Sequence, residues 1–232
     1  METEFPDYIG FFTKEHIRSL AVGVFYLVLA LIFQGYASAY SVANSERFVG
    51  DLVLDHLPAV DLNAIIIEGA FLMILMALCI LLLQPRRLMF AVKAASVFIA
   101  VRSVCVAVTH LGLYPNQILP GNGFIDQVYV ALNLQAGYFF SAHTGLPFLM
   151  ALIFWDDKPW RYIFLSVSAL FGISVLLAHV HYTIDVFAAP FMTYSIFKIS
   201  EYLFADEYRW LKGEARVIKI GIKSAPKAEA RR

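Results

Sequence analysis

The sequence is poor in charge and in cysteine, and it contains no internal repeat. Only 16% of its 232 residues are charged, whereas soluble domains have roughly 25%. Hydrophobic residues make up 60% of the chain, and the mean hydropathy is +0.69. The shortage of charge excludes a soluble globular domain, because so apolar a chain needs lipid around much of its surface. The net charge of zero gives no sign of a nucleic-acid partner.

The two cysteines, Cys79 and Cys105, both lie inside apolar runs. Their number and placement exclude a disulfide framework and a cysteine-based metal site. A cleaved leader is not expected either. The tripeptide Ala37-Ser38-Ala39 resembles a cleavage site, but the apolar run before it is too long for a signal peptide, so we interpret it as a retained span.

Six apolar stretches are long enough to cross a bilayer, which takes about 20 residues. They run over residues 17–40, 62–83, 88–111, 128–155, 162–178 and 182–204. The fourth contains Asn133 and Gln135 in its first half, so its membrane part is expected at 138–155, after a partly exposed helix or loop. The predicted fold class is an all-α polytopic membrane protein with six transmembrane helices.

The distribution of positive charge predicts the orientation of these spans. If both termini are placed on one side, 15 of the 18 Lys and Arg residues lie on that side, and the loops on the other side, 41–61 and 112–137, hold only Arg47. Positive loops face the cytoplasm, so both termini are predicted to be cytoplasmic. The chain then divides into a cytoplasmic or interfacial N-terminus (1–16), a catalytic membrane domain (17–204) and a basic cytoplasmic tail (205–232). A solvated tail is favoured over one that binds anionic lipid head groups.

Ionisable residues near span ends form the candidate site. His143 lies near the outer start of the fourth span, His181 at the outer end of the fifth, and Asp185 at the start of the sixth. Since successive spans alternate in direction, all three reach the non-cytoplasmic face. Such groups are costly in a membrane and are functional candidates by default.

The spacing of His181 and Asp185 indicates how this site works. Four residues apart on a helix, they share one face, so the carboxylate can hold one ring nitrogen and leave the other free to attack. His143 would serve as a separate general acid or base. A nucleophile, a group that orients it and an acid are the minimum set for covalent phosphoryl transfer.

Two charged residues lie deeper in the predicted spans. Arg102 is about nine residues, or roughly 13 Å, from the outer end of the third span, and Glu68 is about six residues inside the second. Either the two pair with each other, or Arg102 faces the cavity and holds a phosphate through its forked donors. The two interpretations are compatible if the ion pair positions the arginine.

Other residues near the outer face have simpler interpretations. The histidines His56, His110 and His179 are expected to be interfacial. The aromatic residues Tyr138, Phe139, Phe140 and Tyr182 are expected to form an interfacial belt, with the lining of a lipid or head-group pocket as a minority role.

Two motifs resemble the sphingomyelin synthase family, part of the type-2 phosphatidic acid phosphatase superfamily. Phe140-Ser-Ala-His-Thr144 is similar to the family's F-S-G-H-T motif, and His179-Val-His-Tyr-Thr-Ile-Asp-Val186 is similar to its H-x-H-Y-T-x-D-V motif. Arg102 and Glu68 fall where the family has an arginine in the third span and a glutamate in the second. The resemblance runs from about residue 45 to 200 and matches a six-span plan.

The resemblance implies a role for each matching residue. His181 would be the nucleophile that forms a phosphohistidine, Asp185 would orient it, and His143 would protonate the leaving diacylglycerol oxygen and then activate the acceptor. Ser141 and nearby backbone amides would help hold the phosphate, with Arg102, Glu68 and Tyr182 as further candidate substrate-binding residues.

The chain departs from the family pattern in two places. Ala142 replaces the motif glycine, and Gln135, Ala136 and Gly137 stand where the synthases have C-G-D. The acidic residue that would meet a cationic head group is therefore missing.

The predicted function is a membrane lipid phosphotransferase that needs no cofactor or metal. Its substrates would be a membrane phospholipid and a ceramide-like lipid alcohol. The alternative is a lipid phosphatase that uses the same residues with water as acceptor. A zinc-dependent membrane hydrolase, with outer histidines as ligands, and a lipid transporter with a proton relay are less favoured.

Overall fold

The computed structural model describes residues 13–45, 47–131 and 137–213, and over these ranges the chain contains helices and no strand. The all-α prediction is therefore confirmed. The helices are α2 (Lys14–Asn44), α3 (Gly69–Leu83), α4 (Pro85–Val108), α5 (Phe124–Ala131), α6 (Ala142–Ile153), α7 (Lys158–Leu177), α8 (Thr183–Leu203) and α9 (Ala205–Leu211). A 3-10 turn, η1 (Leu54–His56), lies in the loop after α2, and a π-helical turn, η2 (Ala64–Glu68), runs directly into α3.

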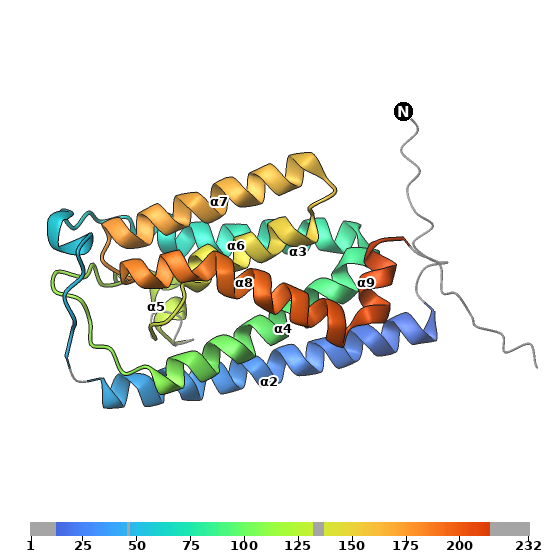
Figure 1. The fold of residues 1–232 in the computed structure, drawn as a ribbon, viewed down its shortest axis with the longest axis horizontal. Helices are drawn as coiled ribbons and strands as arrows, with labels where there is room; N and C mark the ends of the chain where they lie inside the picture. The colour runs from blue at the N-terminus through green and yellow to red at the C-terminus, as the bar shows by residue number, and fades with distance from the viewer. Residues whose placement is uncertain (1–12, 46, 132–136, 214–232) are drawn as a thin grey trace, which may run out of the picture.

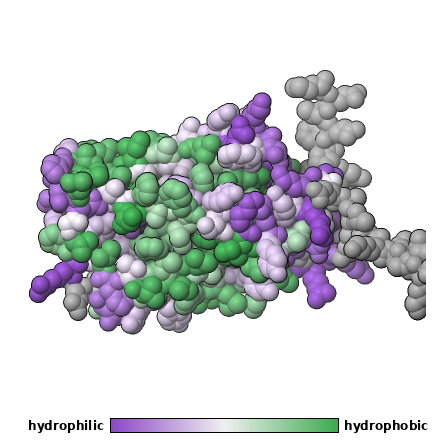
Figure 2. Space-filling model, viewed as in Figure 1, coloured by the Kyte–Doolittle hydropathy of each residue, from purple (hydrophilic) through white to green (hydrophobic). Residues whose placement is uncertain are grey.

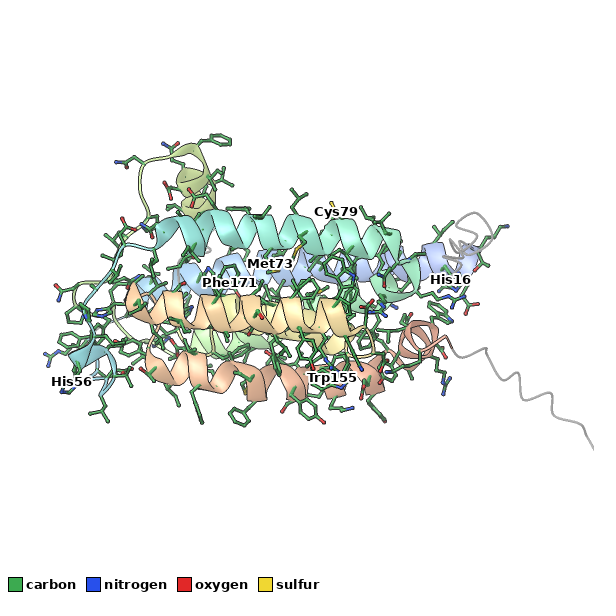
Figure 3. All side chains as sticks on the ribbon, turned by 90° about the horizontal axis from the view of Figure 1, so that it is seen from above. His16, His56, Met73, Cys79, Trp155 and Phe171 are labelled. Carbon is green, nitrogen blue, oxygen red and sulfur yellow. The ribbon has the colours of Figure 1, made fainter. Side chains whose placement is uncertain are left out.

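The long helices form an elongated bundle in which successive members run in alternating directions (Figure 1). The start of α2 and the short helix α9 lie at the same end of this bundle. The loops that follow α2 and α4 lie at the opposite end, close to where α8 begins. Figure 3 shows His16 and His56 at these two opposite ends.

Several of the helices fit a membrane-embedded protein. Within the described residues, four are long and apolar enough to cross a membrane: α2, the continuous helix Ala64–Leu83, α4 and α7. Helix α8 has 21 residues but carries Asp185, Lys198 and Glu201, and α6 has only 12 residues. Hydrophobic side chains cover the middle of the bundle, and hydrophilic ones gather toward its ends (Figure 2).

The fourth predicted stretch, 128–155, is not one continuous helix. Helix α5 ends at Ala131 and α6 begins at Ala142. Before α6, the backbone φ angles of Gly137, Phe139 and Phe140 are 97°, 84° and 38°, and a left-handed backbone cannot continue an α-helix. The break places the start of α6 inside the bundle. Asn133 and Gln135, which first indicated an interruption here, lie outside the described residues.

Helix α9 is held against α2 and α4 by a buried ion pair. The Nζ of Lys93 lies 2.5 Å from Oε1 of Glu207, and the hydroxyl of Ser19 donates to the same oxygen at 2.5 Å. Burial opposes ionisation of Glu207, but the hydrogen bonds from Lys93 and Ser19 outweigh it and lower the pKa of this carboxyl. The predicted basic tail therefore begins with a docked helix. Its later part, from residue 214, and most of the predicted N-terminal segment 1–16 lie outside the described residues.

Gly145 lets α6 approach two other helices closely. A Cβ atom at this position would lie 2.7 Å from Cζ of Phe98 on α4 and 2.9 Å from Oγ1 of Thr193 on α8. Both distances are shorter than van der Waals contact, so a larger residue would push the three helices apart. The position of His143, two residues earlier, depends on this packing.

We expect Gly145→Ala to destabilise the protein although alanine favours a helix. Overpacking typically costs about 1–3 kcal/mol, more than the roughly 1 kcal/mol that alanine gains over glycine in a helix. Since the net cost is at most about 2 kcal/mol, thermal unfolding in detergent should show a Tm about 2–8 °C lower. The matched control is Gly35→Ala in α2, where a Cβ meets no described atom within 4 Å and Tm should stay equal or rise. Equal Tm values for Gly145→Ala and the wild type would contradict this account of the packing.

Candidate active site

Asp185 is buried at the start of α8 and organises the site. Its Oδ2 atom lies 3.1 Å from Nδ1 of His181 and accepts a hydrogen bond from the backbone N–H of Tyr182 at 3.2 Å. Its Oδ1 atom accepts from the N–H of Phe139 at 3.1 Å. These contacts occupy Nδ1 of His181, so Nε2 is the ring nitrogen left for chemistry.

The contact between His181 and Asp185 forms across the beginning of a helix. The sequence spacing predicted that both residues share one helix face, but His181 precedes α8 and lies in the turn after α7. The turn brings the ring back over the first turn of α8, where Asp185 also accepts an orphan backbone N–H. The predicted contact is present, with a different local geometry.

His143 reaches the same place from α6. Its ring centroid lies 6.1 Å from that of His181, with the planes inclined at 67°. The Nδ1 atom of His143 is buried and has no hydrogen-bond partner among the described residues. The two imidazole rings therefore lie close enough for one small bound group to contact both of them.

Ser141 fixes the start of α6 relative to the start of α8. Its backbone N–H donates to the carbonyl of Asp185 at 3.0 Å, and its hydroxyl caps α6 by accepting from the N–H of Thr144 at 3.4 Å. The positive φ angles of Phe139 and Phe140 lie directly before it. Strained backbone of this kind persists where the surroundings over-determine it, commonly at functional sites.

Arg102 is buried on α4 beside this cluster, with only 6% of its surface exposed. Its Nη2 donates to the carbonyl of Gly137 at 3.1 Å, while its Nε has no partner among the described residues. The guanidinium is close enough to interact electrostatically with Asp185 and Tyr129. Arg102 therefore keeps donor capacity at the site.

Glu68 lies apart from this cluster. Its side chain is exposed at the end of η2, and the ion pairs of the described residues do not include one between Glu68 and Arg102. The interpretation of these two residues as a pair is wrong in this structure. The reason is rotational: similar depth in neighbouring spans does not determine which way a side chain faces.

Tyr182 is part of the scaffold of the site. Its hydroxyl donates to the carbonyl of Gly112 at 2.9 Å and accepts from the N–H of Val49 at 3.3 Å. The interfacial-belt interpretation is wrong for Tyr138, Phe140 and Tyr182, because their side chains are buried among other parts of the chain. Here tertiary packing overrides the usual preference of aromatic residues for the membrane surface.

His179 joins the loop after α2 to the loop after α4. Its Nε2 lies 3.2 Å from the carbonyl oxygen of Leu57, and its Nδ1 lies 3.4 Å from that of Pro115. It is 3% exposed and adopts a φ of 55°, so the interfacial interpretation is wrong for this histidine. His56 and His110 are exposed, as expected.

Asp51 ties the loop after α2 to the start of α8. Its carboxylate accepts from the N–H and the hydroxyl of Thr183, both at 2.7 Å. Burial raises the pKa of Asp51, but hydrogen bonds from Thr183, Leu54 and Val53 together outweigh burial and leave this pKa below its usual value. In the same loop, a hydrogen bond to Asp55 raises the pKa of Tyr114 to about 12.

Tyr129, which no sequence motif singled out, also lies at the site. It is 4% exposed on α5, its ring centroid is 6.3 Å from that of His143, and its hydroxyl has no partner among the described residues. It is one of 12 tyrosines in an aromatic-rich chain, so only its surroundings distinguish it.

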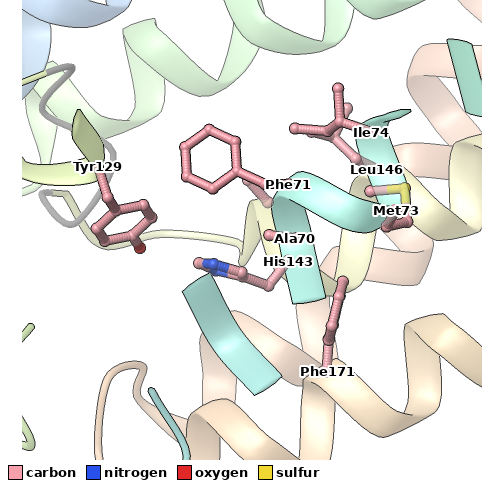
Figure 4. Close-up of a pocket in the computed structure, with 9 residues that line it drawn as sticks. Ala70, Phe71, Met73, Ile74, Tyr129, His143, Leu146 and Phe171 are labelled. Atoms are coloured by element: carbon pink, nitrogen blue, oxygen red, sulfur yellow. The ribbon is translucent and has the colours of Figure 1, made fainter. Parts of the chain in front are cut away.

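An apolar cavity of about 90 Å³ ends at His143 (Figure 4). Apart from His143 and Tyr129, its walls are hydrophobic: Ala70, Phe71, Met73 and Ile74 of η2–α3, Ala142 and Leu146 of α6, and Phe171 of α7. The cavity lies between helices whose outer faces carry exposed apolar side chains, so it offers an apolar chain a route to the imidazole.

Two further expectations concern residues beside the cluster. Gln135 and Ala136, which replace two residues of the C-G-D element, lie outside the described residues, whereas the carbonyl of Gly137 accepts from Arg102. In the described part of the chain, no group of three or more His, Cys, Asp or Glu side chains is arranged to hold a metal ion.

Comparisons with known proteins leave the function open. No known protein family matches the chain, and no solved structure matches it. An uncharacterized protein of Methanocaldococcus jannaschii is 40% identical over 58 residues, which cover 25% of this chain and 24% of the relative. The chain thus spans about a quarter of the length of the curated relative it matches.

We expect Asp51→Asn to lower thermal stability near neutral pH and to lose this effect in acid. A carboxylate with a lowered folded-state pKa stabilises the protein above its unfolded pKa of about 3.9, and this contribution disappears as the pH falls through the folded-state pKa. The difference in Tm between wild type and variant should be full at pH 6 and shrink below about pH 4. Asp61→Asn in the same loop, where the carboxylate accepts the nearby N–H of Asn63, is the control. A Tm difference that stays constant from pH 6 to pH 3 would exclude this role for Asp51.

Proposed function

We propose that this protein is a membrane lipid phosphotransferase that works through a phosphohistidine. It takes a phosphoryl head group from a phospholipid and passes it to a lipid alcohol such as ceramide. The observation that carries the proposal is the buried His181–Asp185 pair facing His143 at the end of an apolar cavity. This arrangement combines a nucleophile, its orienting carboxylate and a separate acid–base group with an apolar approach.

In the first step, Nε2 of His181 attacks the phosphorus atom of the donor lipid. The bond between phosphorus and the diacylglycerol oxygen breaks, and a protonated His143 gives its proton to that oxygen. The products are diacylglycerol and a head group bound to His181. Asp185 holds Nδ1 of His181 at 3.1 Å and stabilises the positive ring during attack.

In the second step, His143, now neutral, removes the proton from the hydroxyl of the acceptor lipid. The acceptor oxygen attacks phosphorus, the bond to His181 breaks, and both histidines return to their starting states. Arg102 stabilises the negative oxygens in both steps through its free donors. Its Nε is buried and has no partner among the described residues, which fits a donor reserved for an anion.

The topology that goes with this function has six crossings, both termini on the cytoplasmic side and the site on the non-cytoplasmic side. The uneven distribution of Lys and Arg supports this orientation. The position of α9 beside the start of α2 supports an even number of crossings. The carboxylate of Asp185 at the start of α8 is hydrogen-bonded within the protein. This helix can therefore be one of the membrane spans although it carries a charged residue.

A purified-protein assay with labelled phospholipid tests the reaction. The label should appear in a new phospholipid when ceramide is supplied, and an acid-labile label should appear on the protein when the acceptor is withheld. We expect His181→Ala to lower turnover by on the order of 10⁴-fold or more, as loss of a nucleophile does. His110→Ala, which removes an exposed histidine after α4, is the matched control and should keep full activity.

Other results of the same assay identify other functions. Release of free phosphate from a phosphate monoester lipid, without transfer to ceramide, would make the protein a phosphatase. Stoichiometric zinc together with activity lost on chelation would support a zinc-dependent hydrolase and contradict the phosphohistidine. Unchanged activity in His181→Ala would refute the mechanism.

The apolar cavity predicts a preference for lipid substrates. Ala70→Phe would fill the space in front of His143, so turnover of a long-chain phospholipid should fall at least about tenfold, since small displacements at a reacting centre cost that much or more. A short-chain, water-soluble analogue should be affected less. The control is Leu72→Phe on the same helix, where the side chain is 67% exposed and does not line the cavity. Equal losses for both substrates would show that the cavity is not their route.

A further inference from the structure

Tyr129 carries a buried hydroxyl that the mechanism above does not use. The side chain is 4% exposed, and its oxygen has no hydrogen-bond partner among the described residues. Buried polar groups are nearly always paired, and an exception calls for an explanation such as a bound ligand. The unpaired hydroxyl therefore points to a group that is bound only during function.

The ring of Tyr129 is held firmly, although its hydroxyl is not. It packs in an apolar cluster with Ile66 and Ile67 of η2 and with Val175 and Val180 at the end of α7. These contacts make the position of the oxygen a property of the fold. A mobile tyrosine on the surface would instead have its hydroxyl hydrogen-bonded to water.

The hydroxyl of Tyr129 points into the site. Figure 4 shows the oxygen end of Tyr129 turned toward the imidazole of His143, and the ring centroids are 6.3 Å apart. Arg102 is near enough to interact electrostatically with the same phenol. Arg102, Tyr129 and His143 thus lie near one another, and each carries a buried atom without a partner among the described residues.

The chemistry of these three groups defines their ligand. A guanidinium and a phenol are hydrogen-bond donors at neutral pH, and an imidazole can donate when protonated. Donors on three sides suit a tetrahedral group with several acceptor oxygens, such as a phosphoryl group, better than a hydroxyl or a cation. An uncharged donor beside Arg102 adds a hydrogen bond without adding positive charge next to His143.

We propose that Tyr129 donates a hydrogen bond to a non-bridging phosphoryl oxygen of the substrate, between Arg102 and His143. This inference rests on the proposed function, because it assumes that a phosphoryl group occupies the site. It makes α5, which lies outside the motifs recognised in the sequence, a part of the binding machinery. No covalent bond is made or broken at Tyr129.

Orthovanadate, a tetrahedral oxyanion that resembles a phosphoryl group, tests this role by calorimetric titration of the full chain in detergent. Tyr129→Phe keeps the ring and removes only the donor, so we expect it to weaken vanadate binding by about ten- to hundredfold, the usual cost of losing a hydrogen bond to a charged group. The matched control is Tyr138→Phe. The hydroxyl of Tyr138 donates to Gln117 at 2.9 Å, while its ring lies 6.2 Å from that of His181.

Thermal stability separates a binding role from a structural one. Tyr129→Phe loses no hydrogen bond to the described residues, so its Tm should be equal to or above that of the wild type. Tyr138→Phe loses a hydrogen bond and should have a lower Tm with vanadate affinity within about twofold of the wild type. Tyr129→Phe should thus lower vanadate affinity but not Tm, whereas Tyr138→Phe should lower Tm but not vanadate affinity.

The outcomes distinguish this inference from the proposed function. If the wild type binds vanadate and forms phosphohistidine while Tyr129→Phe binds as tightly, the role of Tyr129 is refuted and the proposed function stands. A large loss of Tm in Tyr129→Phe would make the residue structural and also refute the inference. If the wild type neither binds vanadate nor carries an acid-labile label, both proposals fail.

Discussion

The site depends on hydrogen-bond donors that satisfy the carboxylate of Asp185 inside an apolar bundle. An unpaired buried charge costs several kcal/mol, so the surrounding chain must supply donors. It does so from three directions: the ring of His181, the N–H of Tyr182 and the N–H of Phe139. The donor from Phe139 requires the left-handed turn before α6. The same requirement therefore aims His181 and also places the start of α6, which carries His143, beside the start of α8.

The loops after α2 and α4 also hold the site in place. Asp51 holds the first turn of α8 through Thr183, and His179 connects the loop after α2 to the loop after α4. Tyr182 links the same two loops through Val49 and Gly112. Residues 179–185 thus position His181 on one side and hold the two loops on the other. A change in the conformation of either loop would therefore shift the position of His181 through these contacts.

The chemistry-bearing residues were predictable where they are close in sequence or share a span end. Hydropathy located the long helices, and alternation of direction brought His143, His181 and Asp185 together. Prediction failed for the pairing of Glu68 with Arg102 and for the interfacial belt at Tyr138, Phe140 and Tyr182. The depth of a residue in a membrane follows from counting residues along the span. The direction in which its side chain points depends on how the helix is rotated about its own axis relative to the neighbouring helices. That rotation is decided by packing, such as the close approach that Gly145 allows.

The sequence by itself determined that the chain is helical and apolar, and that a histidine and a carboxylate four residues apart lie at one span boundary. These properties are local, because hydropathy and spacing are read along the chain. Only the tertiary structure decided that Arg102 and Tyr129 keep donors without a partner among the described residues, while the hydroxyl of Tyr182 is engaged by Gly112 and Val49. Whether a polar atom is free depends on partners from distant segments. Each hydrogen bond formed by the fold removes one group from the set available to a substrate.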